Sequence, residues 1–411
     1  MLAAMKWVIA IAVAGVAGGC KDPPTPVDAA VVATPPIPAK TSSPAPTPTR
    51  EAVEPPPPAS DAGIASCTFL VRATKVAQPG PFTIATSTGS FEVVAQGSGE
   101  PFVVATLNVA PAAVTVPPSS GDGKRQLPGC VAAGASVFCV TSSGDVHRSR
   151  LTPSAKPEGD TVVAHARSGS TLAAALASGH TIVGYTRDRT TSEGPITEAY
   201  VEGDDGTELR VSEDGVGATS VALAPHGDGA IAAYVDARRG MSPVHARTLT
   251  MAGGKLTLGK DAVVFVGGSA EVFTRVTLGA HGPTAYVLLP VAHDIAFGLG
   301  IAKIDGEAPT DAPVSWSDYP NGLDPAPIAA TVGDARTTFV ARVRPSAPKY
   351  GSPRVLEIGE VDAAGAFKAF GVVPTVGSPV DVAIASDNAG GFVLAYTDAA
   401  GGWVLRLKCG A

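Results

Sequence analysis

The stretch Val221-Ala-Leu-Ala-Pro-His-Gly-Asp-Gly-Ala-Ile-Ala-Ala-Tyr234 places a tight turn, rich in glycine, between two short apolar segments. The stretch Val382-Ala-Ile-Ala-Ser-Asp-Asn-Ala-Gly-Gly-Phe-Val-Leu-Ala-Tyr396 repeats this arrangement near the end of the chain. Short apolar runs that flank such a turn predict a β-hairpin. Residues 174–185, 276–286 and 328–341 match the pattern, and weaker copies end near residues 95 and 139.

The hairpins recur at a nearly constant spacing. Their equivalent positions are Ala95, Cys139, Tyr185, Tyr234, Tyr286, Ala341 and Tyr396. Successive positions lie 44, 46, 49, 52, 55 and 55 residues apart, and seven such units fill the 346 residues from Ser66 to Ala411. This period, with several short strands in each unit, is typical of β-propeller blades. We therefore predict an all-β domain over residues 63–411, a single β-propeller of seven blades with four antiparallel strands each.

Composition supports an all-β fold. The 411 residues include 47 glycines and 37 prolines, and only 5% are aromatic, so the chain is rich in turn residues. In a propeller, alanines let the innermost strands approach the central channel, while the next strand carries bulkier side chains. An array of β-sandwiches is the main alternative, but it predicts stronger apolar–polar alternation and no fixed recurrence near 50 residues.

The beginning of the chain has the character of a bacterial export signal. Trp7–Gly19 is an apolar run of 13 residues, whereas a helix needs about 20 residues to span a bilayer. The run ends in Val16-Ala-Gly-Gly-Cys20, which resembles the bacterial lipobox, with Ala17 where leucine or valine is usual. The resemblance implies a signal peptide over residues 1–19, cleavage before Cys20 and lipid on that cysteine. The alternative is an ordinary secretory signal followed by a cysteine by chance.

The segment after Cys20 has the composition of a linker. Residues 21–62 contain thirteen prolines and few large apolar side chains. Proline fixes φ and removes a hydrogen-bond donor, so neither a helix nor a sheet is expected. We predict that residues 20–62 are a lipidated cysteine and a disordered spacer, which would reach roughly 100 Å if fully extended.

Four cysteines remain after Cys20, an even number that predicts disulfides in an oxidising compartment. Four cysteines allow three pairings. Cys130 and Cys139 flank the turn of one predicted hairpin and so face each other across two strands. Cys67 then pairs with Cys409, and in a propeller whose first strand completes the last blade this bond locks the ring. No CxxC motif is present, so we predict no metal site at these cysteines.

Charged residues follow the second strand of several hairpins, in Tyr185-Thr-Arg-Asp-Arg189, Tyr234-Val-Asp-Ala-Arg-Arg239, Ala341-Arg-Val-Arg344 and Tyr396-Thr-Asp398. The Tyr-x-Asp-x-Arg form resembles a repeat of exported bacterial propellers, usually with tryptophan first, and covers two units well and two partly. The resemblance implies that these residues brace turns within and between blades. The functional alternative is a site for an anion or a partner, since arginines bind carboxylate and phosphate groups. Its candidate residues are Arg187, Asp188, Arg189, Asp236, Arg238, Arg342 and Arg344.

The turns between the inner and second strands carry His180, His226, Asp228, His281, Asp334 and Asp387. Such a ring of side chains suggests a metal site, but these residue types also suit tight turns. We favour the turn interpretation and expect neighbouring blades to hold these turns far apart. No metal site is predicted.

No motif predicts catalysis. Sialidases bind a carboxylate with arginines on a propeller, but their Asp-box is missing, and Ser386-Asp-Asn-Ala-Gly390 has Asn388 where aspartate belongs. The GxSxG, HExxH, P-loop and EF-hand patterns are absent as well. We predict no catalytic residue and no cofactor.

Together these features predict an exported lipoprotein of the cell envelope. Its propeller is expected to be a monomeric, non-catalytic binding or scaffold surface for an envelope protein or glycan, similar in architecture to lipoproteins that help assemble outer-membrane complexes. By resemblance to the sorting rules of enterobacterial lipoproteins, Lys21 in place of aspartate favours the outer membrane. The absence of a long Lys/Arg run excludes an electrostatic nucleic-acid footprint. The alternatives are a propeller hydrolase or lyase acting on glycans, and a factor for predation or surface adhesion.

Overall fold

The chain divides into residues Met1–Val53 and Glu54–Ala411, and everything described below belongs to the second unit of this computed structural model. The structure describes residues 64, 67–76, 80–96, 101–110, 112–116, 130–152, 157–192, 194–213, 215, 217–237, 243–265, 276–293, 296–306, 314–319, 328–332, 337–346, 352–386 and 391–409. The predicted signal peptide, the lipidation site Cys20 and the linker over residues 20–62 lie outside these ranges. No helix in the described part of the chain is long and apolar enough to cross a membrane.

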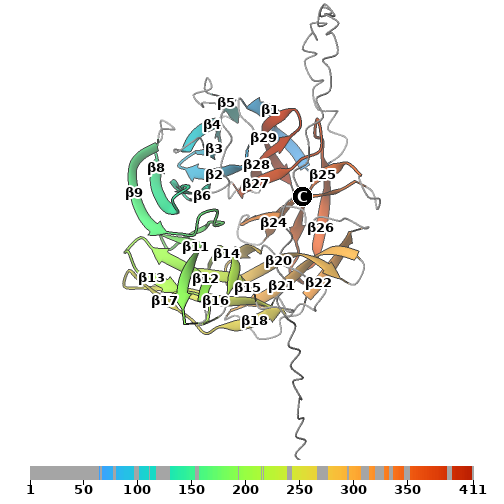
Figure 1. The fold of residues 1–411 in the computed structure, drawn as a ribbon. Coiled ribbons are helices and arrows are strands. Elements are labelled where there is room, and N and C mark those ends of the chain that lie inside the picture. Colours follow the sequence, from blue (N-terminus) through green and yellow to red (C-terminus); the bar gives the residue numbers. More distant parts are fainter. Residues whose placement is uncertain are drawn as a thin grey trace, which may run out of the picture. The chain divides into compact units, whose positions relative to one another are not determined.

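The described residues form 29 β-strands in seven sheets, which are the seven predicted blades (Figure 1). Blade 1 consists of β2 (Phe82–Ser87), β3 (Ser90–Gln96), β4 (Pro101–Asn108) and β5 (Ala113–Thr115). Blade 2 consists of β6 (Cys130–Ala133), β7 (Ser136–Val140), β8 (Asp145–Leu151) and β9 (Pro157–His165). Blade 3 consists of β10 (Ala173–Ala177), β11 (His180–Thr191), β12 (Gly194–Gly203) and β13 (Glu208–Arg210).

Blade 4 contains a fifth strand. It consists of β14 (Ala218–His226), β15 (Gly229–Asp236), β16 (Val244–Ala252) and β17 (Lys255–Leu258), with β18 (Ala262–Phe265) also paired to β16. Blade 5 consists of β19 (Thr277–His281), β20 (Thr284–His293), β21 (Ala296–Asp305) and β22 (Val314–Tyr319). Blade 6 consists of β23 (Ile328–Val332), β24 (Thr338–Pro345), β25 (Arg354–Val361) and β26 (Phe367–Val373).

Blade 7 joins the two ends of the domain, as the sequence predicted. Its strands β27 (Asp381–Ser386), β28 (Gly391–Asp398) and β29 (Gly401–Cys409) are completed by the first strand, β1 (Cys67–Val76), which pairs antiparallel with β29. Cys67 and Cys409 are directly opposite in this register and form a disulfide, with Cα atoms 4.1 Å apart. Cys130 and Cys139 are directly opposite across β6 and β7 and form the second disulfide.

The seven first strands β2, β6, β10, β14, β19, β23 and β27 contact one another in sequence and close the ring around the channel. All seven positions identified as equivalent in the sequence lie on the second strands and are buried. The four tyrosines among them, at 185, 234, 286 and 396, have fully buried rings. These positions share burial on a second strand, but Ala95, Cys139 and Ala341 are small, and Tyr286, opposite Gly279, lies closer to its turn than Tyr234 does, opposite Val221.

The turns between first and second strands of adjacent blades touch, contrary to the expectation that the blades hold them apart. Gly227 N donates to Gly282 O at 2.8 Å, joining blades 4 and 5. Ser178 Oγ donates to Asp228 O at 2.7 Å, joining blades 3 and 4, and Ser178 itself has a φ of 49° in its turn. These turns lie closest to the ring axis, where the small inner side chains let the blades converge.

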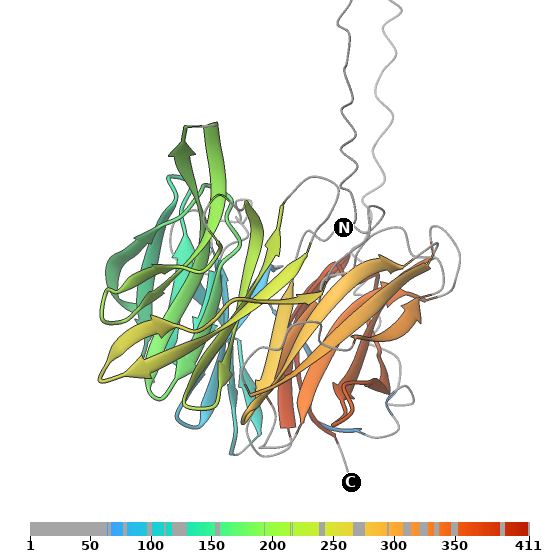
Figure 2. The ribbon, with the colours of Figure 1, turned by 90° about the horizontal axis from the view of Figure 1, so that it is seen from below.

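The opposite side of the ring, where first strands begin and second strands end, is called the arginine face below. Strands β11 and β12 of blade 3 are among the longest in the molecule, with 12 and 10 residues. Their green hairpin extends beyond the neighbouring blades in the view of Figure 2. Blade 3 therefore offers a raised wall beside the channel on the arginine face.

Candidate functional site

The arginine face carries the charged residues that the sequence analysis selected. Arg187, Asp188 and Arg189 lie on the extended part of β11, and Asp236 ends β15. Arg342 and Arg344 lie on β24 of blade 6, two blades further around the ring from blade 4. Arg238 lies outside the described residues. The structure thus gathers these residues blade by blade and does not bring the arginines of blades 3 and 6 into one cluster.

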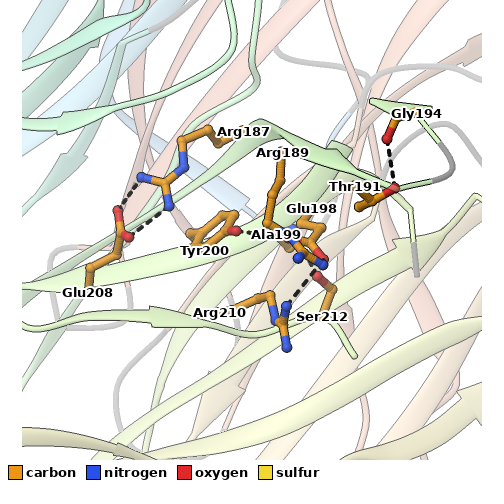
Figure 3. Close-up of polar contacts among 10 residues, drawn as sticks. All are labelled: Arg187, Arg189, Thr191, Gly194, Glu198, Ala199, Tyr200, Glu208, Arg210 and Ser212. Carbon is orange, nitrogen blue, oxygen red and sulfur yellow. Dashed lines mark hydrogen bonds and ion pairs between the residues drawn. The ribbon is translucent and has the colours of Figure 1, made fainter. Parts of the chain in front are cut away.

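Arg187 is held within blade 3 by a carboxylate on the outermost strand. Its Nη1 and Nη2 each donate to an oxygen of Glu208 at 2.8 Å (Figure 3). The guanidinium also lies 4.2 Å from the centre of the Tyr200 ring, a cation–π contact. The hydroxyl of Tyr185 donates to the same Glu208. Pairing and stacking together fix the arginine against β12 and β13.

Glu198 is the centre of a second group of contacts in the same blade. Its side chain is fully buried, and it accepts hydrogen bonds from Arg189 Nε at 2.7 Å and from the Tyr200 hydroxyl at 2.8 Å. Arg210 Nη1 lies 3.4 Å from its other oxygen. Burial alone would raise the pKa of the Glu198 carboxyl, but these hydrogen bonds and the two positive charges outweigh it and hold the pKa below its usual range. Glu198 is therefore an ionised, buried anchor for two arginines.

Blade 6 repeats this arrangement. Arg342 Nε donates to Glu357 Oε2 at 2.6 Å, and Arg344 Nε donates to Oε1 of the same side chain at 3.0 Å. The Arg342 guanidinium lies 4.1 Å from the centre of the Phe367 ring. A glutamate on the third strand thus holds two arginines of the second strand, as Glu198 holds Arg189 in blade 3.

Blade 4 uses a histidine between two carboxylates. His245 Nδ1 lies 2.6 Å from Asp261 Oδ2, and its Nε2 lies 3.8 Å from Asp236 Oδ2. Arg247 Nε donates to Asp261 at 2.8 Å, and the Tyr234 ring stacks on the imidazole at 4.9 Å. Burial would raise the pKa of Asp261, but the hydrogen bonds from His245 and Arg247 lower it below its usual range. Asp236 is fully buried, which makes it part of the blade's polar interior.

In the last blade, Asp398 of the Tyr-x-Asp form braces a turn. Its Oδ1 accepts from Ala400 N at 2.8 Å and from Trp403 Nε1 at 3.0 Å, and its Oδ2 accepts from Gly377 N at 3.1 Å. The bracing role implied by the family resemblance describes this aspartate. Binding of an anion by the selected arginines is a separate property, which these contacts do not test, and it stays a prediction.

The channel is lined by small residues from all seven blades. It holds a cavity of about 430 Å³ toward the turns that carry His226 and His281, and one of about 380 Å³ toward the arginine face. His226 Nε2 lies 2.8 Å from Pro283 O, which ties it to the next blade. Among the described residues, no group of three His, Cys, Asp or Glu side chains has the geometry to hold a metal ion.

A further cavity, which the sequence analysis did not identify, lies on the arginine face between blades 3 and 4. Its volume is about 530 Å³, and Arg167 is one of its lining residues. Arg167 lies in the loop between β9 and β10, outside the repeated hairpins. The only signal in the sequence is the glycine and hydroxyl-rich loop Arg167-Ser-Gly-Ser-Thr171, which by itself is typical of any turn.

No protein-family model matches the chain, and no curated protein matches it. Solved structures that it resembles include the Dos1 propeller, with 8% identity over 83% of this chain and 94% of that chain and a TM-score of 0.47. An oligogalacturonate lyase from Vibrio parahaemolyticus is 10% identical over 82% of this chain and 93% of its own, with a TM-score of 0.48. The SapL1 lectin, solved with alpha methyl fucoside, is 14% identical over 68% of this chain and 95% of its own, with a TM-score of 0.40. At these values the similarity assigns no ligand or activity to the chain.

Proposed function

We propose that this chain is an exported lipoprotein, cleaved before Cys20 and anchored to a bacterial membrane, whose propeller is a non-catalytic binding surface of the cell envelope. The partner would be an envelope protein or glycan, and the arginine face, with its raised hairpin, would meet it. The proposal has two parts, export with anchoring and binding without catalysis, and different observations support them.

Export is supported most directly by the disulfides. Cys67–Cys409 and Cys130–Cys139 join directly opposed strand positions. Disulfides persist in oxidising compartments and are rare in the reducing cytosol. A propeller domain whose two ends are joined by such a bond is suited to the envelope, and the lipobox-like Val16–Cys20 would supply the export route and the anchor.

Binding without catalysis is supported by how the charged groups are used. Glu198, Glu208 and Glu357 each pair with arginines of their own blade, so they are committed to holding strands together. Glycoside hydrolysis by the common mechanisms needs two carboxyl groups that face the same bond. Among the described residues that line the channel at the arginine face, Asp381 is the only carboxylate. The hydrolase or lyase alternative therefore finds no paired carboxylates at that mouth to support it.

The anchor is tested by Cys20→Ala in the full-length protein. We expect the wild type in the membrane fraction and the variant in the soluble fraction of the envelope, because lipid chains on Cys20 supply the attachment. A matched control, Cys130→Ala with Cys139→Ala, removes two thiols but no lipidation site and should stay with the membrane. Continued membrane retention of Cys20→Ala would show that the anchor part of the proposal is wrong.

The binding part is tested by crosslinking in intact cells, followed by affinity capture of the tagged protein and mass spectrometry. A stoichiometric envelope partner that is lost when the β11–β12 hairpin is shortened would support the proposal. A partner that is retained with the shortened hairpin would move the binding surface away from the arginine face. Recovery of the protein alone, with turnover of an envelope glycan by the purified protein, would favour the enzyme alternative instead.

A further inference from the structure

The cavity between blades 3 and 4 is built from four segments that belong to different parts of the repeat. They are the loop 167–171, Thr186 on β11, residues 195–197 on β12, and residues 217–219 with Ala237 in blade 4. Its volume of about 530 Å³ falls within the range of small-molecule sites. The raised β11–β12 hairpin forms one wall and the beginning of β14 the other.

The walls are fixed by hydrogen bonds before any ligand enters. Arg167 N donates to Thr186 O at 2.7 Å, and Ala237 N donates to Gly217 O at 2.8 Å. Thr186 N donates to Ser170 Oγ at 2.9 Å, and the hydroxyls of these two residues lie 3.0 Å apart. A site that is already formed in the free protein loses little conformational entropy on binding.

Among the described residues that line this cavity, Arg167 is the only charged one, and it differs from the other arginines of the face. Its side chain is 56% exposed. Among the described residues, its guanidinium donates a hydrogen bond from Nη1 to Thr197 Oγ1 at 3.2 Å, and its Nε lies 3.6 Å from Asp188 Oδ2. Arg187, by contrast, uses both of its Nη atoms on one carboxylate. Because a guanidinium has five N–H donors, Arg167 keeps donors available within the described site.

Asp188 and Thr197 orient the guanidinium from the rim of the cavity. Thr197 Oγ1 donates to Asp188 Oδ1 at 2.6 Å while it accepts from Arg167. Asp188 does not line the cavity, so its charge steadies the arginine without facing a ligand directly. The exposed pair of Arg167 and Asp188, at 3.6 Å, contributes little to stability. A ligand carboxylate can therefore accept two parallel hydrogen bonds from Arg167 while this pair remains in place.

The remaining lining divides into hydroxyl groups and an apolar wall. Ser168, Thr171 and Thr219 are exposed and offer hydroxyls, while the half-buried Ile196 offers apolar surface. No described residue of the lining is aromatic, so these residues offer no ring on which a ligand could stack. One positive charge, several hydroxyls and a small apolar surface complement an acid that also carries hydroxyl groups.

We propose that this cavity binds a small hydroxy-carboxylate, with the carboxylate on Arg167 and the ligand's hydroxyls on the serine and threonine side chains. Such chemistry occurs in free hydroxy acids and in uronic acid units of glycans. The inference deepens the proposed function, because it names a ligand class for the arginine face. It does not depend on the membrane anchor or on a protein partner, so it stands or falls separately from the partner capture.

The test is calorimetric titration of the purified full-length protein with two matched pairs of probes: glucuronate against glucose, and lactate against lactamide. Each pair differs mainly in the carboxylate. We expect each acid to bind at least about tenfold more tightly than its neutral counterpart, since charge-assisted hydrogen bonds are the strong ones. Glucuronate binding more tightly than lactate would identify a uronic acid unit as the ligand, and the reverse order a free hydroxy acid.

Variants test whether the tighter binding of the acids takes place in this cavity. Arg167→Gln should weaken binding of the acids at least about tenfold, and Thr197→Val should weaken it several-fold by releasing the guanidinium. Arg72→Gln, on exposed β1 of the last blade, removes the same charge elsewhere and should leave the affinity unchanged. Unaltered melting temperatures would show that the variants are folded.

Three results would overturn the proposal: neutral probes that bind as tightly as the acids, unchanged affinity in Arg167→Gln, or no heat of binding for either acid at about 10 mM. A captured envelope partner together with any of these would leave the proposed function in place and remove only the ligand class.

Discussion

Blades 3 and 7 carry a tyrosine at the same position of the repeat, Tyr185 and Tyr396, and both rings are fully buried. The hydroxyl of Tyr185 donates to Glu208, whereas that of Tyr396 has no hydrogen-bond partner among the described residues. Around Tyr396 the blade is apolar, with Leu394 and Trp403 packed nearby. In these two blades the repeat places a tyrosine ring between neighbouring blades. The residues around the ring determine whether its hydroxyl has a hydrogen-bond partner.

The difference follows from how each blade is assembled. Blade 3 is four consecutive strands, and its long hairpin is held by ion pairs to Glu198 and Glu208. Blade 7 unites chain segments from both ends of the domain, so its formation costs more chain entropy. A covalent bond from Cys67 to Cys409 reduces that cost in the unfolded state. Polar contacts hold the long hairpin of blade 3, and the closing blade has a crosslink between the two ends of the domain.

The largest expected effect is loss of the crosslink in blade 7. Cys67→Ala with Cys409→Ala opens a loop of 342 residues, for which the chain-entropy relation gives about 5 to 6 kcal/mol. Cys130→Ala with Cys139→Ala opens a loop of only 9 residues and should cost about 3 kcal/mol less than that. Urea unfolding of both double variants measures the difference. Equal losses would show that loop length does not set the value of these disulfides.

The second effect is loss of the buried anchor in blade 3. Glu198→Gln removes the charge that holds Arg189 and Arg210, and we expect a loss of about 3 kcal/mol in the free energy of unfolding. Glu208→Gln is the comparison, because its side chain is one-third exposed and its pair with Arg187 should be worth about 1 kcal/mol. The glutamine oxygen can still accept the hydrogen bond from Tyr185. If both variants lose the same amount, burial does not distinguish the two glutamates.

The third effect contrasts the two tyrosines directly. Tyr185→Phe removes a hydrogen bond to a carboxylate and should lower the free energy of unfolding by about 2 kcal/mol. Tyr396→Phe removes a buried hydroxyl without a described partner, so it should cost nothing and stabilise by up to about 1 kcal/mol. Denaturant melts of the two variants give both values. A destabilised Tyr396→Phe would point to a partner for that hydroxyl outside the described residues.

The fold could be predicted because its signal repeats. Each blade begins with a hairpin of two apolar strands, and Tyr234 and Tyr396 fall at equivalent places in blades 4 and 7, opposite Val221 and Val382. The disulfide partners follow from the same register, since Cys130 opposes Cys139. Spacing along the chain was sufficient for these features because hairpins are local and every blade repeats them.

The partners of the arginines could not be predicted in this way. Glu198 and Glu357 lie on third strands and Glu208 on a fourth, where the blades share no sequence pattern. The cavity at Arg167 depends on a loop of blade 3 that packs beside the first strand of blade 4. Contacts between blades depend on how two neighbouring blades pack together. A sequence motif within one blade does not predict that packing.

The smallest expected effect is a pH dependence that arises from two opposed glutamates in blade 3. Glu202 on β12 is directly opposite Glu208 on β13, and burial, with the charge of Glu208, raises the pKa of Glu202 to about 7. The folded state therefore holds this proton more tightly than the unfolded chain, and stability falls as pH rises from the unfolded value through about 7. The strands of blade 7 contain no glutamate.

Glu202→Gln should consequently raise the free energy of unfolding by on the order of 1 kcal/mol at pH 8 and leave it nearly unchanged near pH 4.5. Glu213→Gln, at an exposed position before β14, is the control for removing one negative charge. Urea melts at the two pH values measure the effect. The same gain at both pH values would mean that the amide improves packing and that repulsion between the opposed carboxylates of Glu202 and Glu208 plays no part.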